Sequence, residues 1–249
     1  MTEVQAKCAT MDFHDSAPMR LNPMQLSPNS GWRAMGAAAA SVAILGLGVA
    51  ALRTQTAHAA SIAPSAVVIP TEHWLDALKG THRQFFDTPN ANGGLPLVHI
   101  MNYYDTYNKV YGVKDSDVNA VLTFYGGTTF YALNDVAWAK YRIGEFVEAN
   151  DPATGKAALI NPWRAAPTVL GMSLPPASLE SLHHRGATLI LCNNALTILS
   201  GLLAAKRGLD PQTVYADMKA SILPGVELVP GMVIAVEQAE KAGLSYHRQ

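Results

Sequence analysis

Cysteine is scarce in this chain of 249 residues, which contains only Cys8 and Cys192. Two thiols so far apart in the sequence exclude a disulfide-rich scaffold and a Cys-x-x-Cys exchange motif. The histidines are scattered, and no combination of His, Cys and Asp has the spacing of a structural metal site. The sequence therefore predicts no metal and no other cofactor.

Charge of one sign is not in excess either, because 18 Lys and Arg residues stand against 19 Asp and Glu residues, for a formal net charge of −1. Without a basic surplus, a nucleic-acid partner is not expected. The chain contains neither a Gly-x-Gly-x-x-Gly nor a Gly-Lys-Ser/Thr phosphate loop, and no Gly-x-Ser-x-Gly elbow. Nucleotide binding and serine hydrolase chemistry consequently have no support in the sequence.

The longest apolar run lies at residues 34–52, between Arg33 and Arg53. It is followed by Ala57-His58-Ala59, which has the small-x-small pattern that leader peptidases accept. Residues 1–59 are therefore predicted to be the signal peptide of an exported, periplasmic protein. The run is also long enough for a helix to cross the hydrocarbon core of a bilayer, so the alternative is an anchor in the inner membrane.

Strand and helix patterns alternate through the rest of the chain. Residues 60–94 are polar and rich in turn formers, and predict an extended arm. Residues 95–249 predict a single three-layer α/β/α domain with a mostly parallel sheet of about five strands. Residues 148–176, which include Trp163 and Arg164, are interpreted as an insertion. The expected strands are 95–101, 119–125, 187–191, 226–229 and 244–247, and the expected helices are 105–111, 132–141, 177–184, 193–206, 211–222 and 231–242.

Cys192 is the strongest candidate for chemistry, because it follows the predicted strand 187–191 and precedes the predicted helix 193–206. At such a position, free backbone N–H groups and the positive end of the helix dipole favour a thiolate over a thiol. The alternative is a small apolar residue that packs at the end of a strand, since free cysteines are commonly buried.

Further candidates follow from the rule that ligands bind beyond the carboxyl ends of parallel strands. The predicted loops at that edge contain Asn102, Tyr103, Gly126, Gly127, Thr128 and Asn193. Gly126, Gly127 and Thr128 are expected to offer amide or hydroxyl donors to a ligand, and Asn193 is expected to cap the following helix. A tight turn with positive φ explains the two glycines equally well.

Several segments also occur in a characteristic order. They are Val121-Leu-Thr-Phe-Tyr-Gly-Gly-Thr-Thr-Phe-Tyr-Ala-Leu-Asn-Asp135, Leu191-Cys192-Asn-Asn-Ala-Leu196, and Leu223-Pro-Gly-Val-Glu-Leu-Val-Pro230 followed by Gln238 and Gly243-Leu-Ser-Tyr246. Together they resemble the DsrE/DsrF-like family over about residues 95–247. That family consists of small three-layer α/β proteins, many of which carry a cysteine after the third strand. Two features depart from the pattern of the family: the predicted export signal at residues 1–59 and the insertion near Trp163.

The resemblance implies a sulfur relay, in which Cys192 binds sulfur as a persulfide and exchanges it with a donor or acceptor protein. It also implies a homo-oligomer, and five aromatic residues expected on one half of the sheet favour the same conclusion. The alternative is a non-catalytic accessory or assembly subunit, held in a membrane complex by residues 34–52, in which Cys192 serves only for packing. The five aromatic residues are Phe124, Tyr125, Phe130, Tyr131 and Trp138.

Overall fold

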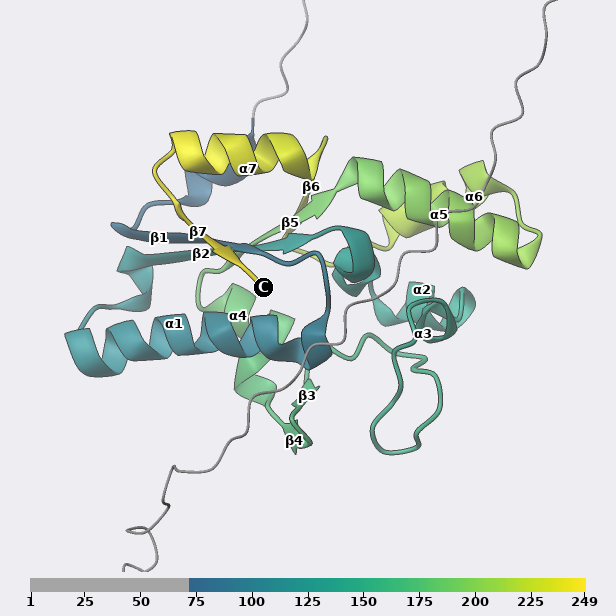
Figure 1. Cartoon of the computed structure of the whole chain (residues 1–249), viewed down its shortest axis with the longest axis horizontal. Coiled ribbons are helices and arrows are strands. Elements are labelled where there is room, and N and C mark those ends of the chain that lie inside the picture. Colours follow the sequence, from purple (N-terminus) through teal and green to yellow (C-terminus); the bar gives the residue numbers. More distant parts are fainter. Residues whose placement is uncertain (1–71) are drawn as a thin grey trace, which may run out of the picture. The chain divides into compact units, whose positions relative to one another are not determined.

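The computed structural model describes residues 72–249 (Figure 1). In this part of the chain, five parallel strands form one sheet in the order β6-β5-β2-β1-β7. Helices lie on both faces of the sheet, so the predicted three-layer α/β/α domain is confirmed. The strands are β1 (His82–Asp87), β2 (Val118–Phe124), β5 (Thr188–Cys192), β6 (Val226–Val229) and β7 (Ser245–Arg248).

The helices fall into two groups about the sheet (Figure 1). Helices α1 (Leu95–Tyr111) and α4 (Leu179–His184) lie on one face, while α7 (Met232–Lys241) and the 3-10 turn η1 (His73–Ala77) lie on the other. Helices α5 (Asn193–Arg207) and α6 (Pro211–Ala220) pack against each other. The segment between β2 and α4 contains η4 (Gly126–Ala132), α2 (Asp135–Lys140), α3 (Ile143–Phe146), the antiparallel pair β3 (Thr168–Val169) and β4 (Met172–Ser173), and η5 (Pro175–Ala177). Two short turns, η2 (Asn92–Gly94) and η3 (Asp115–Asp117), flank α1.

Alternate strand residues supply two separate cores. Phe85, Val121 and Ile190 pack with Trp74 and α7, and their neighbours along each strand pack with α1. This is the two-residue period of a β-strand, which sends successive side chains to opposite faces. Cys192 has the parity of Ile190, so its side chain lies on the α7 face.

The strand predicted at 95–101 is wrong, because these residues form the first half of α1. The buried positions Leu97, Ile100 and Tyr104 are spaced three and four apart, which is the period of a helix. Pro96 stands in the first turn, where the helix needs no N–H donor. The helix expected at 105–111 is the second half of the same element.

The extended arm expected at 60–94 is also wrong in its second half, because residues 82–87 form β1 in the sheet. The sequence His-Arg-Gln-Phe-Phe-Asp shows no alternation of polar and apolar residues, so it did not predict a strand. In the structure, only its last three positions are buried. All the other predicted strands and helices are confirmed to within three residues at each end.

The aromatic residues expected to form an exposed patch belong instead to the core of the monomer. Phe124, Phe130, Tyr131 and Trp138 are at most 5 % exposed, and Tyr125 is half-buried. These residues therefore form no exposed patch that would favour a homo-oligomer.

The predicted signal peptide or anchor, residues 1–59, lies outside the described residues. Within residues 72–249, no helix has both the length and the apolar character needed to span a bilayer.

Arg185 joins the end of α4 to α1 and to the turn before β2. Its guanidinium donates hydrogen bonds to Asp115 (Nε to Oδ2, 2.9 Å), to Asp105 (Nη1 to Oδ1, 2.6 Å) and to Asn108 (Nη2 to Oδ1, 2.8 Å). It also lies 4.8 Å from the centroid of the Tyr104 ring. Because the Arg185 side chain is only 19 % exposed, solvent screens these contacts weakly.

We expect Arg185→Met to lower the free energy of unfolding by about 2 kcal/mol at pH 7, because Asp115 loses its ion-pair partner and Asp105 keeps only Lys109. Hydrogen bonds from Lys109 and Arg185 lower the pKa of Asp105. Burial opposes a lower pKa at Asp115, but hydrogen bonds from Arg185 and Asn108 outweigh it.

Carboxyl groups whose pKa is depressed by folding stabilise the protein above their unfolded-state value of about 4, and this contribution is lost as the pH falls. Urea unfolding of the wild type and the variant should therefore show a difference at pH 7 that narrows at pH 3. The control Lys109→Met removes an exposed ion pair and should cost about 0.5 kcal/mol or less. A difference between wild type and Arg185→Met that does not depend on pH would contradict this account.

Candidate functional site

Cys192 is the last residue of β5 and the N-cap of α5. Its partner on β6 is Val229, and continuation of the β2–β5 register places Tyr125 beside it on the other side. The side chain is 5 % exposed and packs with the core on the α7 face, against which Tyr125 also packs. The sequence therefore predicted correctly that the thiol stands at a junction between strand and helix.

Two backbone amides point at the sulfur. Cys192 Sγ accepts a hydrogen bond from Ala195 N–H at 3.4 Å and another from Met232 N–H at 3.3 Å. Ala195 lies in the first turn of α5, and Met232 is the first residue of α7. Since the N-terminus of each helix carries partial positive charge, both helices favour negative charge on the sulfur.

Asn193 has a role different from the predicted one. Cys192 occupies the N-cap position, and the Asn193 side-chain oxygen instead accepts a hydrogen bond from the Tyr215 hydroxyl on α6 at 2.7 Å. The carbonyl oxygen of Asn193 accepts a bond from Thr197 Oγ1 at 2.9 Å. Asn193 therefore attaches the start of α5 to α6, while the sulfur of Cys192 caps the helix.

The loop after β2 uses its donors within the protein. The Gly127 amide donates to the Pro89 carbonyl oxygen at 2.8 Å, and the Thr128 amide donates to the Tyr125 carbonyl oxygen at 3.2 Å. The Thr128 hydroxyl donates to the Thr88 carbonyl oxygen at 2.6 Å. Gly126 has φ +57°, which favours glycine, so this loop has the features of the tight-turn interpretation. The donors assigned from sequence to a ligand at Gly127 and Thr128 are thus already engaged.

Asn102 and Tyr103 are not near Cys192. Both lie in the middle of α1, where they line an open groove of about 390 Å³ together with Phe86 and His247. Because α1 covers the face of the sheet opposite to α7, the sheet separates this groove from the thiol. Their assignment to the site followed from the wrongly predicted strand at 95–101.

The sequence analysis missed an acidic residue at the same edge of the sheet. Asp87 ends β1 and is 5 % exposed, and its Oδ2 accepts a hydrogen bond from the Tyr246 hydroxyl. Burial, and then the Asp87 carboxylate, raises the pKa of Tyr125, which lies between β1 and β5. Since β1 is two strands from β5 and the register places Asp87 level with Ile190, two residues before Cys192, the two residues are about 12 Å apart. Recognition of a strand at residues 82–87 would have placed Asp87 at this edge.

Comparison with known proteins identifies no relative, because no family model, curated protein or solved structure matches the chain. The interpretation of this site consequently depends on its own geometry.

Gly127→Ala is expected to lower the free energy of unfolding by about 1 kcal/mol, because a Cβ atom there would lie 3.2 Å from the Pro89 carbonyl oxygen. The alkylation rate of Cys192 in the folded protein should stay unchanged, since the Gly127 amide already donates to Pro89. Urea unfolding and iodoacetamide kinetics measure the two effects.

Gly201→Ala in α5 is the matched control, because a Cβ atom there meets open space and should not destabilise the protein. If Gly127→Ala slowed alkylation of Cys192 by about tenfold or more in the folded protein, the result would show that the loop after β2 contributes to the reactivity of the thiol.

Proposed function

We propose that this protein is a sulfur carrier in which Cys192 holds a sulfur atom as a persulfide. The observation that carries the proposal is the meeting of two amide donors, from α5 and α7, at one sulfur atom. Both bonds use Sγ as the acceptor, which suits a thiolate that attacks a sulfur donor and a thiolate that is released again. The resemblance to the DsrE/DsrF-like family, stated above on sequence, points to the same chemistry.

The transfer step is redox-neutral. The Cys192 thiolate attacks the terminal sulfur of a persulfide or polysulfide, a new S–S bond forms, and the S–S bond of the donor breaks as the donor leaves as a thiolate. Transfer to an acceptor thiol reverses these roles. The carrier therefore needs a donor or acceptor protein as its partner. Self-association is also proposed, and only the family resemblance supports it.

We place this carrier outside the cytoplasm, because residues 34–52 have the composition of a signal-peptide core or a membrane anchor. In the anchored form the protein would belong to a membrane complex. A cleaved signal peptide lowers the mass of the mature chain, whereas a retained anchor does not. Measurement of the intact mass of protein from the producing cells distinguishes the two.

A second candidate function is that of a non-catalytic accessory subunit with a purely structural cysteine. It is favoured by the 5 % exposure of Cys192 and by the apolar side chains around it. A buried thiol that caps a helix and packs in a core needs no reactivity. The two functions predict different behaviour of the thiol in the folded protein.

Incubation of the protein with inorganic polysulfide should add the mass of one or more sulfur atoms to Cys192, and a reductant should remove it. Cys192→Ser should abolish the addition at this position, and any sulfur that remains on this variant is assigned to Cys8, the only other cysteine in the chain. Cys8→Ser is the matched control and should load normally. If native Cys192 acquires no sulfur and reacts with iodoacetamide only after denaturation, the accessory function stands and the carrier function fails.

Met232→Pro tests the donor from α7 directly. Met232 is the first residue of the helix, where proline is tolerated, and Gly231 before it is extended with φ −157° and ψ 130°. The substitution removes the N–H that donates to Sγ and also removes the buried methionine side chain.

Met232→Ala is the matched control, because it removes the same side chain and keeps the N–H. We expect alkylation of native Cys192 at pH 7 to be about threefold or more slower in Met232→Pro than in Met232→Ala. The two rates should become equal in urea. Equal rates in the folded proteins would show that the α7 amide does not activate the sulfur.

A further inference from the structure

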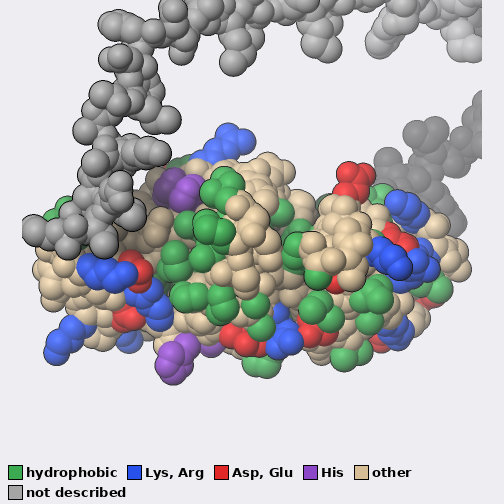
Figure 2. Space-filling view, turned by 90° about the horizontal axis from the view of Figure 1, so that it is seen from below, with side chains coloured by type: hydrophobic (Ala, Val, Ile, Leu, Met, Phe, Trp, Pro, Cys, Tyr) green, Lys and Arg blue, Asp and Glu red, His purple; other side chains and the backbone are tan. Residues whose placement is uncertain are grey.

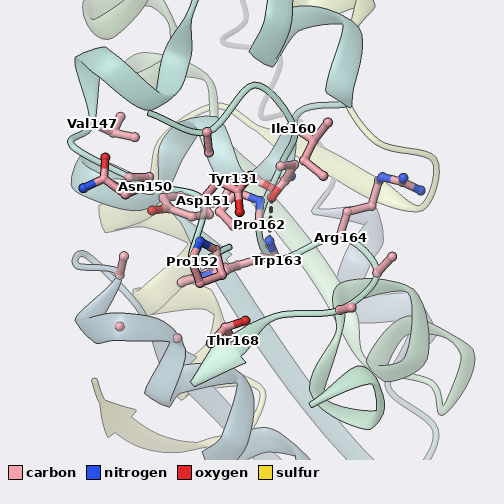
Figure 3. A pocket seen from close by; sticks show the side chains of 18 of the residues that line it. Tyr131, Val147, Asn150, Asp151, Pro152, Ile160, Pro162, Trp163, Arg164 and Thr168 are labelled. Carbon is pink, nitrogen blue, oxygen red and sulfur yellow. Dashed lines mark hydrogen bonds between the residues drawn. The ribbon is translucent and has the colours of Figure 1, made fainter. Parts of the chain in front are cut away.

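The insertion between α3 and α4 encloses a cavity of about 550 Å³ (Figure 3). Its walls come from the loop before α1, from η4 and from residues 147–168. Aromatic and aliphatic side chains dominate the lining, among them Tyr131, Val147, Pro162 and Trp163. A cavity of this volume with mostly apolar walls and a few polar groups has the character of a small-molecule site.

Two hydrogen-bond donors in this cavity have no partner among the described residues. The two residues are only 5 % and 4 % exposed, but the Tyr131 hydroxyl and Trp163 Nε1–H form no hydrogen bond within the described residues, and neither donor atom is itself fully buried. The other buried tryptophans differ, because Trp74 Nε1 donates to Glu72 at 2.6 Å and Trp138 Nε1 donates to the Phe130 carbonyl oxygen at 2.9 Å. Because both donor atoms are accessible and use no acceptor among the described residues, they are free to donate to an acceptor on a ligand in the cavity, in place of water.

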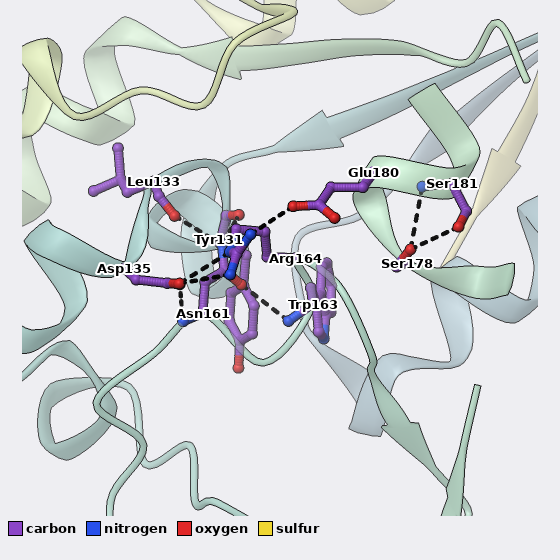
Figure 4. Close-up of polar contacts among 9 residues, drawn as sticks. All are labelled: Tyr131, Leu133, Asp135, Asn161, Trp163, Arg164, Ser178, Glu180 and Ser181. Carbon is purple, nitrogen blue, oxygen red and sulfur yellow. Dashed lines mark hydrogen bonds and ion pairs between the residues drawn. The ribbon is translucent and has the colours of Figure 1, made fainter. Parts of the chain in front are cut away.

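The aromatic rings that carry the two donors lie side by side. The ring centroids of Tyr131 and Trp163 are 4.3 Å apart, with 38° between the ring planes. In Figure 4 both rings extend away from the Asp135–Arg164 ion pair. Gly94 lets the loop before α1 pack closely against this wall of the cavity, since a Cβ atom at Gly94 would lie 2.8 Å from Val169 Cγ2 and 3.8 Å from Trp163 Nε1. Burial raises the pKa of Tyr131 to about 12, so its hydroxyl keeps its proton at neutral pH.

A buried polar network holds these rings in place (Figure 4). Asn161 Nδ2 donates to the carbonyl oxygens of Tyr131 at 2.6 Å and Leu133 at 2.8 Å, and Asn161 Oδ1 accepts from the Trp163 amide at 3.0 Å. Asp135 accepts from the Asn161 amide at 2.9 Å. Because the backbone on both sides of the cavity is fixed in this way, the site is formed before a ligand arrives.

The charges of the lining select against an anion. Glu148 and Asp151 contribute negative charge to the walls. The positive charge of Arg164 is already paired with Asp135 at 2.8 Å and with Glu180 at 2.6 Å. A neutral ligand avoids repulsion from the two carboxylates and still accepts hydrogen bonds from the two aromatic donors.

We propose that this cavity is a binding site for a neutral, flat and mostly apolar molecule that carries a carbonyl oxygen, which accepts hydrogen bonds from Tyr131 and Trp163. The aromatic rings and prolines contact the apolar body of the ligand. The site is independent of Cys192, which lies on the α7 face and lines no part of this cavity.

The test uses three probes with one naphthalene body and the full-length chain. The probes are 2-acetylnaphthalene, which carries the carbonyl, 2-ethylnaphthalene, which carries no acceptor, and 2-naphthoate, which carries a negative charge. Titration calorimetry and saturation-transfer NMR measure their affinities. The ketone is expected to bind about fivefold or more tightly than either of the other two probes.

Tyr131→Phe removes the hydroxyl without loss of a hydrogen bond in the protein, so the variant should fold normally. It is expected to weaken binding of 2-acetylnaphthalene about fivefold and to leave 2-ethylnaphthalene unchanged. Tyr111→Phe is the matched control, because Tyr111 is exposed and lines the other groove. Equal affinity of Tyr131→Phe and wild type for the ketone, tighter binding of 2-naphthoate, or binding of none of the probes would overturn the proposal.

Discussion

Parallel pairing of β5 with β2 and β6 is the constraint on which the thiol site depends. It brings the carboxyl ends of three strands to one edge, and the helices that follow β5 and β6 both begin there. The amides of Ala195 and Met232 consequently reach the same sulfur atom, although Met232 is 40 positions away from Cys192 in the sequence. Neither helix alone would surround the sulfur with donors from two directions.

The local half of this arrangement could be predicted from the sequence. A short apolar run followed directly by a long helical run predicted β5, α5 and the place of Cys192 between them. The contribution of Met232 could not be predicted, because it depends on how α7 is placed over the sheet. The hydrogen bond of the Gly127 amide could not be predicted either, because its acceptor is the carbonyl oxygen of Pro89, in the loop after β1.

Two errors in the prediction have a common physical cause. The residues of α1 before position 102 include β-formers, and those of β1 include charged and amide side chains, so local composition favoured the wrong element in both. Tertiary burial decided the outcome, since α1 buries Leu97, Ile100 and Tyr104 on one side while β1 is paired on both edges. These two errors explain why Asn102 and Tyr103 were wrongly predicted in the site and why Asp87 was not predicted there.

The insertion gives the protein a second surface of different character. Figure 2 shows the molecule from below, the side of α1, with hydrophobic side chains in the middle of the face and charged ones among them. On the insertion itself, Leu159, Ile160, Leu170 and Met172 are each more than half exposed. The sequence indicated that residues 148–176 are an addition to the fold, but the cavity beneath them depends on hydrogen bonds of Asn161 to residues about 30 positions earlier. Cys192 lines no part of this cavity, so substitutions at the cavity wall leave the contacts of the thiol in place.

The position of β1 between β2 and β7 has a consequence for how the chain folds. Among the strands of residues 72–249, β7 pairs with β1 alone, and the Tyr246 hydroxyl that donates to Asp87 Oδ2 comes from 159 positions further along the chain. During synthesis, one edge of β1 and a buried carboxylate stay uncovered until residue 248 has been made. An open strand edge is a template for pairing with other chains, so a nascent chain that stalls before β7 is expected to aggregate more readily than the complete chain.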